Sequence, residues 1–181
     1  AAVKKNAALG YDYVAAPASA ELLFLRHMPD KALKPYFNIL RTVVLTSRHE
    51  MDPDMMVEAS LKIDVHGNVE HTAAGGFGPV HALDRALRRA LTRWYPELEQ
   101  MHLIDYKVRV LSPTRTNIPD AAEENGTGSN VRVLIESSDG VATWTTVGVS
   151  YNIIEASLEA LADAVTYKLY KTEQARWRAE C

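Results

Sequence analysis

Cysteine is almost absent from this sequence of 181 residues, because the only one, Cys181, is the last residue. A single thiol excludes a disulfide framework within the chain and a metal site built on several cysteines. Long apolar runs are also missing, so no stretch is long enough to cross a bilayer as a helix. The first residues lack the apolar core and cleavage site of a secretory signal, and we expect a cytoplasmic protein with no membrane partner.

A strong excess of charge is missing too. Lys and Arg number 20 against 23 Asp and Glu, which gives a formal net charge of -3. This mild acidity offers no electrostatic reason to expect a nucleic-acid partner. Hydrophobic residues make up 47% and charged residues 24%, values typical of a globular protein. The length suits one ordinary domain with an extension.

Arrangements of residues that carry chemistry are absent as well. No serine lies in a nucleophile elbow, and the carboxylates Asp105, Glu136 and Asp139 fit strands or turns better than acid–base catalysis. The histidines form no HExxH or Cys/His spacing; they are His27, His49, His66, His71, His81 and His102. The sequence therefore predicts no catalytic residue, no metal ligand and no cofactor in this chain.

What is present is a pattern of strands and helices that occurs twice. Strands are predicted over 37–48, 57–65 and 69–76, with a tight turn at His66-Gly67, and a helix opens at Pro79. A second set follows, with strands over 102–111, 131–138 and 141–149 and a turn at Asp139-Gly140. Ser150 or Asn152 can cap the next helix, and Glu155 is placed to complete a capping box with Asn152. The repeated order indicates duplication of one unit.

The fold class predicted is therefore α+β, with two β-β-β-α units that form sheet-plus-helix layers. We place these units at 36–96 and 102–173, within one domain over 36–181, and expect a flexible polar insert at 112–130. Residues 1–35, with a helix over 18–28, are predicted to be a linker or small subdomain that follows something upstream. Two such layers leave a sheet face or edge to cover, so we expect a symmetric homodimer with its helices outside.

The glycine-rich junction at 75–80 (GGFGPV) is the most informative local feature. A strand end, glycines and a helix start present N–H groups and a positive helix end to an anion such as a carboxylate. An equally good interpretation is that the glycines only let the helix pack closely on the sheet. The arginines Arg85, Arg88, Arg89 and Arg93 lie off the apolar stripe of this helix and are predicted to be a solvated face rather than a site for an acidic partner.

Three segments carry a resemblance to a known family: 71–91 (HTAAGGFGPVHALDRALRRAL), 103–111 (LIDYKVRVL) and 131–169 (VRVLIESSDG through VTYKL). They resemble the C-terminal regulatory domain of the isopropylmalate synthase and citramalate synthase family, and the last is most similar to the citramalate synthase branch. Residues 9–23 resemble the family's linker. The resemblance covers nearly the whole chain except the insert.

This resemblance implies that the chain is an allosteric, dimerising domain that binds isoleucine, or leucine, as a feedback inhibitor. The parent enzyme would be an acetyl-CoA-dependent acyltransferase of branched-chain amino-acid biosynthesis. Its catalytic barrel, with a divalent metal, is not in this chain, so the chain alone is expected to be inactive. The alternative is a structural dimerisation domain of the same enzyme without effector binding.

The resemblance also implies an effector pocket near the dimer interface, lined by both repeats. Its predicted residues come from the two strand–helix junctions and the strands between them: Gly76, Gly78, Val80, His81, Leu103, Tyr106, Val110, Val131, Tyr151 and Ile153. Apolar walls would suit a branched side chain, and N–H groups at a helix start would suit its carboxylate. Phe77 and Tyr151 depart from the family's usual residues at this site.

Overall fold

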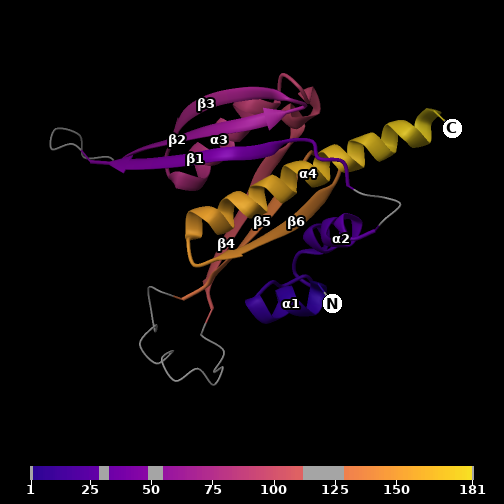
Figure 1. Ribbon diagram of the computed structural model, residues 1–181, viewed down its shortest axis with the longest axis horizontal. Helices are drawn as coiled ribbons and strands as arrows, with labels where there is room; N and C mark the ends of the chain where they lie inside the picture. Colours follow the sequence, from indigo (N-terminus) through magenta and orange to yellow (C-terminus); the bar gives the residue numbers. More distant parts are fainter. Residues whose placement is uncertain (1, 29–32, 49–54, 112–128, 181) are drawn as a thin grey trace. The chain divides into compact units, whose positions relative to one another are not determined.

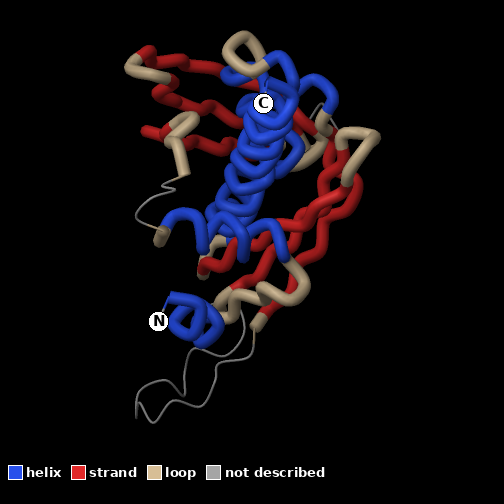
Figure 2. The backbone as a smooth tube through the Cα atoms, turned by 90° about the vertical axis from the view of Figure 1, so that its right-hand side faces the viewer, coloured by secondary structure: helices blue, strands red, loops and turns tan. Residues whose placement is uncertain are grey.

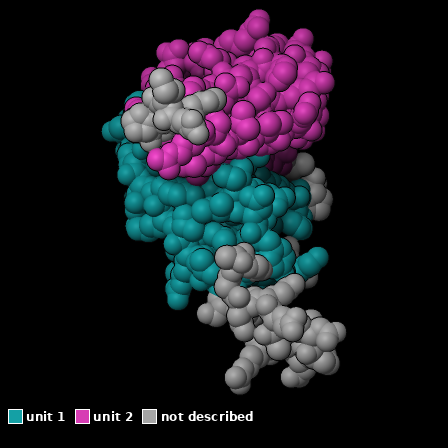
Figure 3. All heavy atoms as spheres, turned by 90° about the vertical axis from the view of Figure 1, so that its left-hand side faces the viewer, with its two compact units in different colours: residues 1–32, 102–167 teal, residues 33–101, 168–181 magenta. Residues whose placement is uncertain are grey.

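The computed structural model describes residues 2–28, 33–48, 55–111 and 129–180. The chain divides into two compact units, coloured separately in Figure 3. Unit 1 contains residues 1–32 and 102–167, and unit 2 contains residues 33–101 and 168–181. Most of the predicted insert at 112–130 lies outside the described residues.

Unit 2 is built on a three-stranded antiparallel sheet in the order β1-β2-β3. Its strands are β1 (Asn38–Ser47), β2 (Met56–Val65) and β3 (Asn68–Gly76), which lie side by side in Figure 1. The turn between β2 and β3 places His66 at φ 53° and Gly67 at φ 84°. Two successive residues with positive φ define the hairpin turn that matches the twist of the flanking strands, as the sequence predicted.

The helix α3 (Pro79–Leu91) packs on this sheet and is followed by the short 3₁₀ helix η2 (Pro96–Gln100). Alternate residues of β2 are buried beneath it, and so are the apolar residues of the α3 stripe. The strand's contribution is Val57, Ala59, Leu61, Ile63 and Val65. The period of two along β2 and the helical period along α3 therefore meet in one aliphatic layer.

Unit 1 repeats this plan with β4 (His102–Val110), β5 (Val131–Ser138) and β6 (Thr143–Ser150), again antiparallel and in the order β4-β5-β6. The helix α4 (Ile153–Glu180) follows and contributes its residues through Tyr167 to this unit. Unit 1 also holds the N-terminal helices α1 (Ala2–Leu9) and α2 (Pro17–Arg26), and α2 contacts β6. Figure 2 distinguishes the helices and strands by colour.

Backbone pairings and one side-chain hydrogen bond recur in both units at a constant spacing. Thr72 of β3 donates a hydrogen bond to the Ala86 carbonyl of α3 (2.9 Å), and Thr146 of β6 donates one to the Ala160 carbonyl of α4 (2.8 Å). Both residues of the second bond lie 74 positions after those of the first. The cross-strand pairs follow the same spacing, since Leu61↔Thr72 corresponds to Ile135↔Thr146.

Even an irregularity is repeated. The register shifts between Ile39 and Arg41 in β1, and between Leu103 and Asp105 in β4, at corresponding points. A bulge bends a strand locally and is rarely incidental. The α+β fold of two β-β-β-α units predicted from the sequence is confirmed.

Some local predictions are wrong. Arg88 is not on a solvated face, because it pairs with Asp84 (2.9 Å) and donates to the carbonyls of Leu98 and Met101, which fixes η2 against α3. Glu155 does not complete a capping box, since it accepts from the Ser150 hydroxyl (2.5 Å) while the Asn152 N–H donates to that hydroxyl instead.

Candidate functional site

The β3–α3 junction of unit 2 contains two glycines with different structural roles. A Cβ on Gly76 would lie 2.5 Å from the Ala82 nitrogen, so this residue must be glycine for α3 to pack against the end of β3. Gly78 has φ -164°, an extended conformation open to any residue, and a Cβ there would have nothing within 4 Å. The fold therefore requires Gly76, whereas the structure leaves open space at Gly78.

The residues around Gly78 form an exposed surface. Phe77 is 97% exposed and stacks on the His81 ring, with centroids 5.3 Å apart. The Phe77 N–H donates to His81 Nδ1 (3.2 Å), and Val80 is half-buried beside them. No side chain caps the N-terminus of α3. Its first N–H groups, which have no partner within the helix, are therefore not covered by a capping side chain.

The β6–α4 junction of unit 1 is built differently. The Asn152 side chain accepts from the Ile154 N–H (2.8 Å) and so caps α4. Close packing falls on Gly148, where a Cβ would lie 2.0 Å from the Ala156 carbonyl oxygen. Tyr151 is 67% exposed and stands 74 positions after Phe77, so each junction carries one exposed aromatic ring.

The four predicted strand residues lie on the helix-facing side of the sheet in unit 1. Val110 pairs with Val131 at one end of the β4–β5 ladder, and Tyr106 and Leu103 follow along β4. The Tyr106 hydroxyl hydrogen-bonds the Ser157 hydroxyl of α4 (2.9 Å). The predicted site residues thus fall into a group of four in unit 2 and a group of six in unit 1. Their role in binding an effector stays a prediction.

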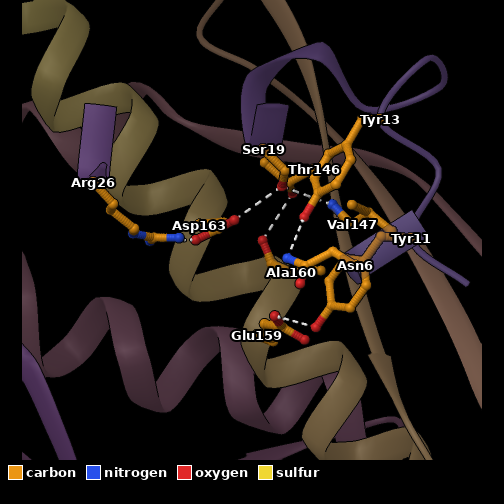
Figure 4. Close-up of polar contacts among 10 residues, drawn as sticks. All are labelled: Asn6, Tyr11, Tyr13, Ser19, Arg26, Thr146, Val147, Glu159, Ala160 and Asp163. Carbon is orange, nitrogen blue, oxygen red and sulfur yellow. Dashed lines mark hydrogen bonds and ion pairs between the residues drawn. The ribbon is translucent and has the colours of Figure 1, made fainter. Parts of the chain in front are cut away.

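A polar cluster that the sequence did not predict lies beside the β6–α4 junction (Figure 4). Glu159 accepts from the Tyr11 hydroxyl (2.7 Å) and from the Val149 N–H (3.1 Å). Asp163 accepts from the Ser19 hydroxyl (2.9 Å) and pairs with Arg26 (2.7 Å). These bonds attach the N-terminal segment to the first half of α4.

Burial governs the electrostatics of this cluster. It raises the pKa of the Glu159 carboxyl above its ordinary value of 4.5, although the hydrogen bonds from Tyr11 and Val149 oppose that shift. Burial, and then the bond to Glu159, likewise raise the pKa of the Tyr11 phenol above its usual range. The Asp163 side chain is only 10% exposed, so its charge depends on the partners that the N-terminal segment supplies.

Local sequence patterns could not have found this cluster. The bonded residues Tyr11 and Glu159 are 148 positions apart, and Ser19 and Asp163 are 144 apart. The one available signal was a spacing of four between acidic residues at the start of α4, which also suits a solvated helix face.

Unit 2 contains a separate pocket of about 160 Å³. It is lined by Lys34, Tyr36, His66, Tyr95, Glu97, Leu169, Glu173 and Arg176. Its polar groups largely satisfy one another, since Tyr36 donates to Glu173 (2.6 Å) and Arg176 pairs with Glu97 (3.4 Å). Because these side chains already pair with one another, few polar groups are left to bind a ligand. This pocket is therefore a weaker candidate than the junctions.

Within the described ranges, no three His, Cys, Asp or Glu side chains gather into a group that could hold a metal ion. No helix in the same ranges is both long enough and apolar enough to cross a membrane. The features that remain are the two junctions, the acidic cluster and the duplicated fold. Together they define a class of protein: a duplicated β-β-β-α domain with two strand–helix junctions and an acidic cluster that holds its N-terminal segment.

Comparison with known proteins identifies the family. Residues 15–169 match the family described as the LeuA allosteric (dimerisation) domain. The chain belongs to this family, as the resemblance in the sequence indicated.

Several curated relatives share its sequence. The chain is 47% identical over 165 residues to an (R)-citramalate synthase of Aquifex aeolicus, covering 91% of this chain and 29% of that protein. It is 43% identical to an (R)-citramalate synthase of Geobacter sulfurreducens over 95% of this chain and 30% of that protein. A 2-isopropylmalate synthase of Aquifex aeolicus is 29% identical over 76% of this chain and 23% of that protein. The chain spans less than a third of the length of these relatives.

Proposed function

We propose that this chain is the regulatory and dimerisation part of an acetyl-CoA-dependent acyltransferase of the (R)-citramalate synthase type, and that it binds isoleucine, or leucine, as a feedback inhibitor. Family membership over residues 15–169 supports the regulatory role. Identities of 37% to 47% with (R)-citramalate synthases support the parent activity. The catalytic residues and the divalent metal would belong to a part of the enzyme outside this chain.

The observation that carries the effector site is the open β3–α3 junction. The uncapped start of α3 offers N–H groups and a dipole worth about 0.3–1 kcal/mol to a carboxylate. The exposed Phe77 ring supplies apolar surface beside it. Burying one aliphatic side chain contributes roughly 1.5–3 kcal/mol, so an amino acid with a branched side chain suits these two features together.

Gly78→Val tests this site. The structure has open space at Gly78, so the variant should fold normally. Its branched side chain would fill the space through which the ligand must approach the start of α3. Titration calorimetry with isoleucine, leucine and valine should show binding by the wild-type chain and its loss in the variant. Isoleucine should be preferred over leucine, by no more than about 1–3 kcal/mol.

Gly75→Val is the matched control. A Cβ at Gly75 would meet only the Val57 carbonyl oxygen at an ordinary 3.7 Å, so this variant should fold and bind like the wild type. Unchanged isoleucine affinity in Gly78→Val would remove the site assignment. A wild-type chain that binds none of the three amino acids at millimolar concentration would leave the structural dimerisation role instead.

Assembly and catalysis are tested separately. We expect a symmetric homodimer, which sedimentation should detect as a species of twice the chain mass at tens of micromolar. A monomer at that concentration would contradict the dimerisation role. We expect no release of CoA when the chain is mixed with acetyl-CoA and pyruvate, because the catalytic barrel of the parent enzyme would lie outside this chain.

A further inference from the structure

One face of α4 carries a row of hydrogen-bonding side chains spaced four residues apart. Its members are Glu155, Glu159, Asp163 and Tyr167, which we call the acidic stripe. Residues at this spacing lie above one another along a helix. Each member has a partner off the helix: Ser150, Tyr11, Ser19 and Glu21, in that order. The stripe therefore runs from the β6–α4 junction along the N-terminal segment.

The stripe also holds the outer edge of β6. The Val149 N–H donates directly to Glu159 (3.1 Å). The Val147 N–H donates to the Ser19 hydroxyl (3.0 Å), which in turn donates to Asp163 (2.9 Å). Edge N–H groups need partners. Here a strand edge, a helix face and the N-terminal segment share the same two carboxylates, so displacement of any one of them alters the bonds of the other two.

The equivalent row in unit 2 has the opposite charge. Its members stand 74 positions earlier and are His81, Arg85, Arg89 and Arg93. Arg85 donates to the Gly75 carbonyl (2.8 Å) and Arg89 donates to the Ala73 carbonyl (2.8 Å), so this row also holds an edge, that of β3. Edge support thus does not require acidic residues. Acidic residues on α4 can also accept hydrogen bonds from the hydroxyls of the N-terminal segment, Tyr11 and Ser19, and these additional partners explain why the row on α4 is acidic.

The stripe begins at a candidate ligand surface. Glu155 binds the Ser150 hydroxyl (2.5 Å), and that hydroxyl also accepts from the N–H of Asn152, the residue that caps α4. The exposed Tyr151 lies between these two residues. A ligand at this junction would contact the end of β6, which carries Val149, and the first turn of α4, which lies one turn before Glu159.

We propose that the acidic stripe couples ligand occupancy at the β6–α4 junction to the docking of the N-terminal segment, residues 11–26, with Glu159 and Asp163 as the coupling residues. The proposal rests on the proposed function and extends it, because it needs an effector at the β6–α4 junction, in contact with Tyr151 and Ile153, as well as at the β3–α3 junction. It adds that the effect of ligand binding passes from the junction, through the acidic stripe, to residues 11–26. Coupling of this kind is reciprocal, so weakening the docked segment must also change effector affinity.

Hydrogen exchange with and without saturating isoleucine tests the coupling, after calorimetry has established whether isoleucine binds. In the wild-type chain, isoleucine should change the exchange rates of the amides of α2 by about 5-fold or more. Asp163→Asn should raise those rates without ligand and abolish their response to isoleucine while binding persists. Tyr11→Phe is the second variant, in case Asp163→Asn fails to fold. It removes the hydroxyl that donates to Glu159 and should weaken the response.

Arg89→Gln is the matched control, because it changes the equivalent position of the unit 2 row. Its α2 amides should respond to isoleucine as in the wild type, and a lost response there would overturn the assignment to the acidic stripe. If isoleucine binds and α2 exchange does not change, the coupling is refuted while the proposed function stands. If calorimetry shows no binding, both fall.

Discussion

The two units share their backbone pairing but differ in what surrounds it. Strand partners, the bulge in the first strand and the threonine-to-helix hydrogen bond recur at corresponding positions. The helix rows that flank the last strand are basic in unit 2 and acidic in unit 1. The interior also differs, since Leu83 and Ile63 of unit 2 correspond to Ser157 and Ser137 of unit 1, all fully buried. Duplication thus preserved the ladder, whose bonds depend on the backbone, and left side chains free to diverge.

The largest expected effect concerns the close packing of the last strand of each unit against the helix that follows it. Gly76 permits this packing in unit 2, and Gly148 permits it in unit 1. Gly148→Ala and Gly76→Ala should each destabilise the chain by about 3 kcal/mol, because the added Cβ overlaps the backbone of the following helix. Urea denaturation measures this. Gly78→Ala, with open space around its Cβ, should change stability by less than about 0.5 kcal/mol. Equal effects at all three positions would contradict the division of roles between the glycines.

The second comparison concerns the two rows. Asp163→Asn should destabilise the chain by about 1–2 kcal/mol, since bonds to a buried charge are lost or weakened, and the figure is moderated by the 45% exposure of Arg26. Arg89→Gln, at the equivalent exposed position, should cost less than about 0.5 kcal/mol. The difference between their midpoints in thermal or urea unfolding is the measurement, and a larger loss in Arg89→Gln would reverse the comparison.

The third comparison concerns the polar interior of unit 1. The Ser137 hydroxyl is fully buried and finds no hydrogen-bond partner in the described part of the chain. Ser137→Ala removes that unmet group and should stabilise the chain by about 1 kcal/mol. Ser157→Ala should do the reverse by a similar amount, because its hydroxyl bonds Tyr106 (2.9 Å) and the Ile153 carbonyl (2.6 Å). Thermal unfolding of the two variants compares them, and destabilisation by both would show that Ser137 has a partner.

Features of this molecule were predictable from the sequence when they depend on residues close together in the chain, and not when they depend on distant ones. Strands, hairpin turns and helices were predictable because they depend on periods of two and 3.6 and on turn residues such as His66-Gly67 and Asp139-Gly140. Of the partners of Arg88, Asp84 lies four residues earlier on the same helix. Arg88 was misjudged because the other two, the carbonyls of Leu98 and Met101, depend on how the chain turns after α3. A helical spacing alone cannot show that turn.

The junctions were predicted only in part. The sequence located both of them, but it treated Gly76 and Gly78 alike, and only the position of Ala82 separates packing from open space. The acidic stripe was missed because three of its four partners, Tyr11, Ser19 and Glu21, lie more than a hundred positions from it. Resemblance to a family supplied the predicted class of ligand, which neither periodicity nor spacing indicates.

The smallest expected effect concerns pH and Glu159. Burial raises the pKa of its carboxyl above 4.5, against the two hydrogen bonds it accepts; Asp163 adds to the rise, and Arg26 opposes it. The folded chain therefore binds this proton more readily than the unfolded chain does. The stabilisation from this group is fully present below about pH 4.5 and is lost as the pH rises through the raised value.

Glu159→Gln should flatten that fall in stability above about pH 4.5, because an amide does not titrate. The amide oxygen can still accept from Val149, and its nitrogen can donate to the Tyr11 oxygen, so the segment stays docked. Urea midpoints across this range measure the slope for the variant and the wild type. Arg85→Gln, at the equivalent position of unit 2, replaces a group that stays charged throughout this range, so it should leave the slope unchanged. If stability changed with pH to the same degree in Glu159→Gln and in the wild type, the Glu159 carboxyl would have the same pKa in the folded and unfolded chains. Its burial would then not destabilise the ionised form in the folded unit.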